Sequence, residues 1–97
     1  MNFGKYIIIE SSYGSFKQAI LFDSTMNHSD FLDMFNRNFI LSAGFFSTRA
    51  KPTEEDPEDI EISVFGKSVT LKLKSNKKDS FYIKRVLRKN IYGSSSV

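Results

Sequence analysis

The sequence predicts a small α+β fold: an antiparallel sheet of about five strands with one short and one longer helix. Three observations predict it. The chain has 97 residues, about the size of one domain. Its composition, 40% hydrophobic and 26% charged, is ordinary for a globular protein. Segments with strand and helix periodicity follow the order β-β-α-β-β-β-α, so residues 1–97 are interpreted as a single domain.

The first two strands are expected at residues 5–10 (KYIIIE) and 16–22 (FKQAILF), because both runs are rich in β-branched and aromatic residues. Residues 11–15 separate them with turn-forming side chains. Gly14 in this stretch can adopt positive φ, which favours a hairpin turn. The two strands are therefore expected to pair.

A short helix is expected at residues 30–36. Ser29 suits its N-cap, and Asp30 lies in the first turn, where the helix dipole favours an acid. Phe31 and Phe35 are four residues apart and fall on one apolar face.

A third strand is expected at residues 38–46 (NFILSAGFF), in which Gly44 marks a bulge or a close approach of another backbone segment. Residues 47–59 follow it. They include Pro52, Pro57 and a run of acids, so an exposed acidic loop is expected there.

Two further strands are expected at residues 60–64 and 69–73, where apolar and polar residues alternate. Residues 65–67 (FGK) are expected to join them as a tight hairpin.

The second helix is expected at residues 79–90. Ile83, Val86 and Leu87 recur at helical spacing and are expected to face the core. Residues 93–97 are expected to form a flexible C-terminal tail.

Charge is divided unevenly along the chain. Residues 1–65 carry five cations and ten acids, a net charge of −5, whereas residues 66–97 carry nine cations and one acid, a net charge of +8. Spacing on the second helix places four of these cations on one face, and the neighbouring strand can add three more. The cations are Lys84, Arg85, Arg88 and Lys89 on the helix, with Lys67, Lys72 and Lys74 on the strand.

This basic face has three interpretations. It can bind an anion, such as nucleic acid, a nucleotide phosphate or an acidic protein. It can be a solvated face whose cations complement the helix dipole. Alternatively, the acidic loop folds across the helix and neutralises it. The loop itself is either a solvated segment or a mimic of a phosphate backbone that docks on a basic partner.

The aromatic content, ten Phe and four Tyr, is high for this length. Adjacent residues of a strand face opposite sides, so only one of Phe45 and Phe46 can reach the core. The other requires a cover, which can be a helix, a partner subunit or a ligand. Together with Phe39 and Tyr13, this pair offers a stacking surface for bases, or it packs in the core or a dimer interface.

No catalytic set stands out in the sequence. Cysteine is absent, which excludes disulfides, thiolate metal sites and cysteine nucleophiles. His28 is adjacent to Ser29 and Asp30, but a catalytic triad is assembled from positions that are distant in sequence. Asp23 and Asp33 are interpreted as surface acids. We therefore expect no enzymatic activity, no metal and no cofactor.

The absence of cysteine favours a reducing, cytoplasmic setting. The apolar run at residues 6–9 is too short for a signal peptide, and no segment is long enough to span a bilayer. We therefore expect no membrane association.

Several segments form an ordered set: KYIIIE, QAILF, NHSDF, LSAGFF and VFGKSVTLKLKS, followed by a short basic helix. This set resembles small uncharacterised proteins encoded by bacteriophages and prophages, over roughly residues 5–87. The resemblance implies an accessory protein that acts in a bacterial host cytoplasm. It supplies no activity, cofactor or functional residue.

We therefore expect a non-enzymatic, phage-type accessory binding protein, in the form of a homo-oligomer. It would antagonise a host defence process by sequestering an anionic, nucleotide-like ligand or by blocking a host protein. Nucleic-acid binding through the basic C-terminal helix and a structural assembly role are the alternatives. The residues expected to contact a ligand or partner are Lys84, Arg85, Arg88, Lys89, Lys72, Lys74, Phe45, Phe46 and Tyr13.

Overall fold

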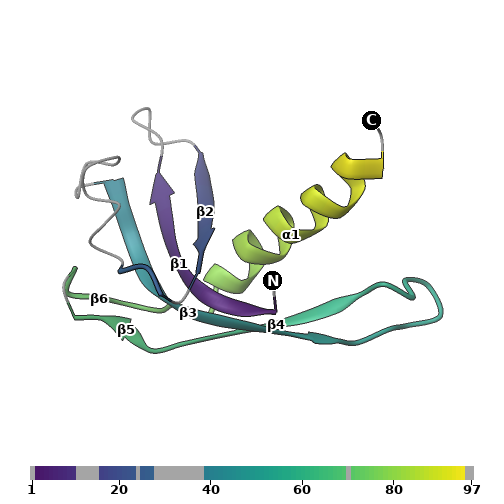
Figure 1. Cartoon of the computed structure of the whole chain (residues 1–97), viewed down its shortest axis with the longest axis horizontal. Coiled ribbons are helices and arrows are strands. Elements are labelled where there is room, and N and C mark those ends of the chain that lie inside the picture. Colours follow the sequence, from purple (N-terminus) through teal and green to yellow (C-terminus); the bar gives the residue numbers. More distant parts are fainter. Residues whose placement is uncertain (1, 11–15, 24, 28–38, 70, 96–97) are drawn as a thin grey trace.

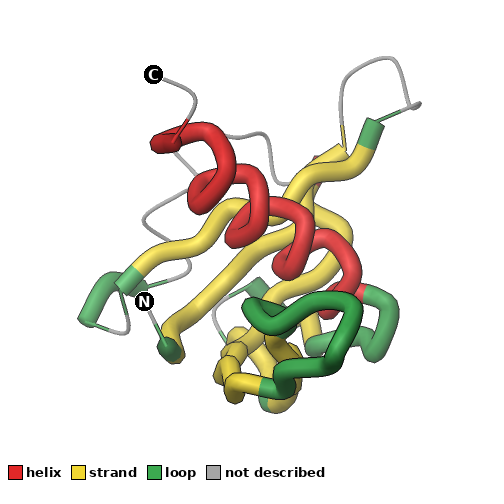
Figure 2. Tube along the Cα trace, turned by 90° about the vertical axis from the view of Figure 1, so that its right-hand side faces the viewer, coloured by secondary structure: helices red, strands yellow, loops and turns green. Residues whose placement is uncertain are grey.

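A computed structural model describes residues 2–10, 16–23, 25–27, 39–69 and 71–95. Four strands form an antiparallel sheet in the order β2-β1-β3-β4, and a separate two-stranded sheet pairs β5 with β6 (Figure 1). One helix, α1, crosses the larger sheet diagonally (Figure 2). The elements are β1 (Phe3–Glu10), β2 (Lys17–Phe22), β3 (Ile40–Ala50), β4 (Ile60–Phe65), β5 (Lys67–Ser68), β6 (Leu73–Lys74) and α1 (Asp79–Ser95).

Alternation along the strands divides the core between the two faces of the sheet. On one face, Tyr6 and Ile8 of β1 are buried with Phe46 and Ile83, beneath α1. On the other face, Ile7 is buried in a second cluster. That cluster also contains Phe22, Ile40, Ala43 and Leu71. The sheet is thus covered by α1 on one side and partly by the β5–β6 hairpin on the other.

Helix α1 begins where the sequence predicts and is stabilised there by reciprocal caps. Asn76 Oδ1 accepts a hydrogen bond from the Lys78 N–H at 3.0 Å, and Asp79 Oδ2 accepts one from the Asn76 N–H at 2.9 Å. Ile83 is fully buried, and Val86 and Leu87 pack against the same cluster, as expected. The helix continues to Ser95, so it is longer than the expected 79–90.

Strand β3 contains the two irregularities that a glycine in a strand suggested. Its register with β1 shifts between Ile8 and Ile9, which pair with Ser42 and Ile40, so Leu41 is an extra bulged residue. At Gly44, an added Cβ would lie 2.8 Å from the Phe65 carbonyl oxygen. The glycine therefore allows β4 to approach closely. β3 also runs on to Ala50, so the acidic loop begins at residue 51 rather than 47.

The expected strand at 69–73 is wrong. Val69 is 77% exposed, and Lys72 has a φ of 57°, which is left-handed backbone. Residues 69, 71 and 72 instead lie in a turn after β5, and β6 begins at Leu73. The tight hairpin expected at 65–67 is also wrong, because β5 pairs with β6 and not with β4.

A small α+β fold is therefore confirmed, while the single sheet of five strands is replaced, in the described residues, by one of four and one of two. The expected turn at 11–15 and helix at 30–36 lie outside the described residues. Within the part of the chain that is described, no helix has the length and hydropathy needed to cross a bilayer.

Candidate anion-binding pocket

The basic face of α1 is paired with the acidic loop. Lys84 Nζ lies 2.7 Å from Asp59 Oδ1, and Arg88 Nη1 lies 2.7 Å from Asp56 Oδ2. The hydrogen bond from Lys84 is the main reason why the pKa of Asp59 lies below its ordinary value. Of the three interpretations of this face, the structure supports the loop folding across the helix.

Arg85 is the third cation of α1 whose side chain is described, and it also has a local partner. Arg85 lies over the ring of Phe16, 5.9 Å from its centroid, which is a cation–π distance. The side chain of Lys89 lies outside the described part of the chain. Among the helix cations with described side chains, none is left without a neighbouring anion or ring.

The paired phenylalanines point to opposite faces, as the strand period requires. Phe46 is fully buried beneath α1, so it is a core residue. Phe45 is half-buried on the other face and stacks on Phe65, with ring centroids 5.9 Å apart. Phe39, which immediately precedes β3, is exposed. Tyr13 lies outside the described residues.

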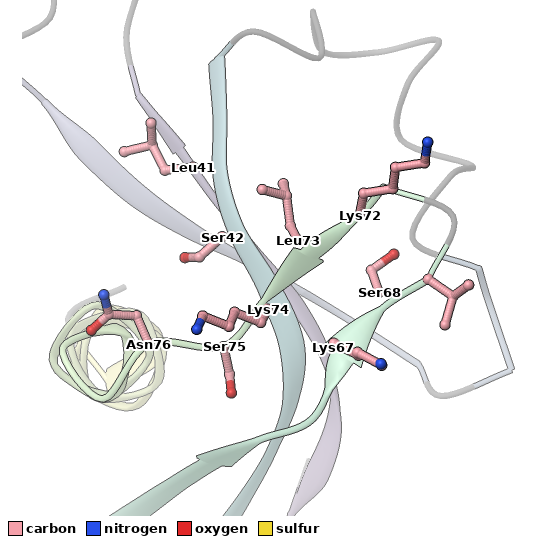
Figure 3. A pocket seen from close by; sticks show the side chains of 10 residues that line it. Leu41, Ser42, Lys67, Ser68, Lys72, Leu73, Lys74, Ser75 and Asn76 are labelled. Atoms are coloured by element: carbon pink, nitrogen blue, oxygen red, sulfur yellow. The ribbon is translucent and has the colours of Figure 1, made fainter.

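The sequence suggested that Lys72 and Lys74 extend the basic face of α1. In the structure they do not. Leu71 and Leu73, which alternate with them, pack into the cluster around Ile7 on the opposite face of the sheet. The two lysines instead border an open pocket of about 660 Å³ (Figure 3). The described residues that line it are Leu41, Ser42, Lys67, Ser68, Val69, Lys72, Leu73, Lys74, Ser75 and Asn76.

Local structure explains why these residues come together. Strand β6 lies beside the part of β3 that β4 does not reach, since β4 pairs only with residues 45–50. The bulge in β3 places Leu41 in the pocket wall. The turn after β5 is closed by the Leu71 N–H, which donates to Ser68 Oγ at 3.2 Å. Because Lys72 is left-handed, the chain reverses there within a few residues.

Figure 3 shows how the side chains are arranged. Lys74 extends toward Ser42 and Asn76, whereas Lys67 and Lys72 point away from Lys74. Leu41 and Leu73 supply apolar surface beside them. The pocket thus combines one lysine among hydrogen-bonding groups with aliphatic surface and two further lysines.

The charge around this pocket is positive. None of the ten described residues that line it is acidic, and residues 66–78 contain five lysines and no acid. The next acid, Asp79, is buried and accepts hydrogen bonds from Tyr6 and Asn76. Within the described residues, Lys67, Lys72 and Lys74 form no salt bridge. An anion in the pocket would therefore meet positive charge that no described acid compensates.

Sequence reasoning found the lysines but missed Leu41, Ser42, Ser75 and Asn76. For Asn76 a signal was present, because Asn followed by Asp three residues later is typical of a helix N-terminus. The other three positions depend on the bulge in β3 and its contact with β6, which no local pattern reveals.

In the described part of the chain, no three His, Asp or Glu side chains gather as metal ligands. Comparisons with known proteins give no relative from which a site could be transferred: no protein-family model, curated protein or solved structure matches the chain.

Proposed function

We propose that this chain is a non-enzymatic binding protein that holds an anionic, nucleotide-like small molecule in the lysine-lined pocket. The observation that carries the proposal is the combination of size and charge. A volume of about 660 Å³ lies within the usual range for small-molecule sites, and the described lining contains three lysines and no acid.

The pocket offers different chemistry to the two ends of such a ligand. Lys74 lies near Ser42 and Asn76, so a phosphate or carboxylate can accept hydrogen bonds from all three side chains. Leu41 and Leu73 offer apolar surface for a base or another flat group. Lys67 and Lys72 raise the positive potential at the entrance, which speeds the association of anions.

The wider role that we propose follows from the resemblance to small phage proteins. A protein that binds a nucleotide without turning it over removes it from solution, and in a bacterial cytoplasm this would antagonise a defence process that relies on a nucleotide signal. The pocket supports sequestration. It supports equally a carrier of any anion of this size, so the ligand has to be identified directly.

Native mass spectrometry tests the proposal on protein purified from a bacterial host, before and after addition of ATP as a probe. We expect extra mass that is lost on denaturation, either from the host or from ATP. The double variant Lys72→Gln with Lys74→Gln should lose it. The control Lys77→Gln with Lys78→Gln removes the same charge from exposed positions of the same segment and should retain it. No extra mass under either condition, or an equal loss in both variants, would contradict the proposal.

A further inference from the structure

A second surface lies on the sheet face opposite α1 and is here called the aromatic face. It consists of Phe3, Lys5, Phe45 and Phe65. Lys5 pairs with Phe45 and Phe45 pairs with Phe65, so these three residues form a row across β1, β3 and β4. Phe3 precedes Lys5 by two residues and therefore points to the same side.

Two rings of this face are open to solvent. Phe3 is 61% exposed and Phe65 is 49% exposed. Phe45 is half-buried between Phe65 and the Nζ of Lys5, which lies 5.7 Å from its ring centroid. Exposed phenylalanines that gather on one face are costly in water and are typical of a surface with a partner.

The charges on and beside the aromatic face are mainly positive. Lys5 lies within it, and Arg49 follows on the same side of β3. Arg49 and Lys51 share one acid, Glu61, at 2.9 and 3.0 Å. Among these described groups, three cations thus stand against one carboxylate. A symmetric contact between two copies would bring this positive surface against itself, whereas a polyanion complements it.

From the exposed rings and this charge, we propose that the aromatic face binds single-stranded nucleic acid. Phe3 and Phe65 stack on bases, and Lys5 and Arg49 contact phosphates. Aromatic side chains interleaved with cations are the usual means of binding single strands, because every base has a face on which a ring can stack. Phe3 and Phe65 lie two strand spacings apart across the sheet and two residues apart along it, which places them about 12 Å from each other. They therefore contact separate bases of one strand.

This site is independent of the lysine-lined pocket, with which it shares no residue. It also differs from the basic helix that the sequence suggested for nucleic acid, since the described cations of that helix have partners in the acidic loop or on Phe16.

The test is fluorescence anisotropy with a labelled oligothymidylate. We expect binding that weakens as salt rises, because counterions are released from the phosphates. Phe3→Ala and Phe65→Ala should each weaken affinity by roughly tenfold, within the range for one stacked base. Both side chains are exposed, so the variants should keep the circular dichroism spectrum of the parent. Phe81→Ala is the matched control, because Phe81 is 66% exposed but lies on α1. It should bind as the parent does.

Three results would overturn the proposal. One is the absence of binding at low salt. Another is an equal loss of affinity in Phe81→Ala. The third is a dimer in sedimentation experiments that Phe3→Ala and Phe65→Ala both dissociate, since the face would then join two copies of the chain. The double variant of Lys72 and Lys74 should bind the oligonucleotide with the affinity of the parent, which separates this site from the pocket.

Discussion

Tyr6 and Asp79 connect the first strand to the start of the helix through one buried hydrogen bond. The Tyr6 hydroxyl donates to Asp79 Oδ2 at 2.6 Å, and both residues are almost fully buried. Burial raises the pKa of Tyr6, and the neighbouring carboxylate acts in the same direction. The hydroxyl therefore stays protonated and remains a donor. Because Asp79 also caps α1, this contact sets where the helix begins relative to the sheet.

We predict that Tyr6→Phe lowers the free energy of unfolding by about 1–3 kcal/mol, because it removes a donor from a buried carboxylate. Denaturant unfolding measures this change. Tyr82→Phe is the control, since Tyr82 is only half-buried on α1; it should cost less than about 0.5 kcal/mol. Equal costs for the two variants would show that the buried hydrogen bond contributes nothing specific.

Single residues also show what a local pattern can and cannot reveal. Gly44 was expected to mark a bulge or a close approach, and the structure contains both within a few residues of it. The left-handed backbone of Lys72 was not predictable from its residue type, because lysine rarely adopts positive φ. Leu71 and Leu73, on either side of it, pack against the cluster around Ile7, a tertiary contact that no local pattern at Lys72 reveals.

At the scale of elements, the acidic loop and α1 form an electrostatic pair. Asp59 lies near Lys84 and Arg88, and its pKa is lowered chiefly by the hydrogen bond from Lys84. A carboxylate whose pKa is lower in the folded state stabilises that state above its ordinary pKa. This stabilisation is lost as the pH falls through the lowered value.

We therefore predict that acidification below about pH 4 destabilises the parent protein more than the variant Asp59→Asn, which carries no titrating group at this position. Urea unfolding across a pH series measures the difference. The control is Glu58→Gln, an exposed acid of the same loop, and it should follow the parent curve. A parallel pH dependence in the parent and Asp59→Asn would contradict the role assigned to this pair.

Elements with clear periodicity were predictable. β1 and β2 lie within a few residues of the runs of β-branched and aromatic residues that predicted them, and β4 and the start of α1 lie where strand and helix periodicity predicted them. The stretch at 69–73 shows the limit of this reasoning. Alternation identified Leu71 and Leu73 correctly as inward-facing residues. It did not show that the backbone between them turns, because side-chain burial and backbone extension are separate properties.

For the whole molecule, the sequence identified which residues carry charge but not which charges are compensated. The cations of α1 appeared to be the stronger site, yet the loop at 51–59 reaches Lys84 and Arg88. The lysines of β5, β6 and their turn appeared secondary, yet they border the pocket. Both outcomes depend on contacts between segments that are distant in sequence. The opposite orientations of Phe45 and Phe46 needed only the strand period, and they were predictable.

An amide chemical-shift titration of isotope-labelled protein with ATP directly tests whether the lysine-lined pocket binds a nucleotide. The proposed site predicts saturable shifts that cluster at Leu41, Ser42 and residues 67–76, and that weaken strongly in Lys74→Gln. Shifts that cluster instead along α1 near Lys84 and Arg88, or the absence of saturable shifts at millimolar ATP, would contradict binding in the lysine-lined pocket.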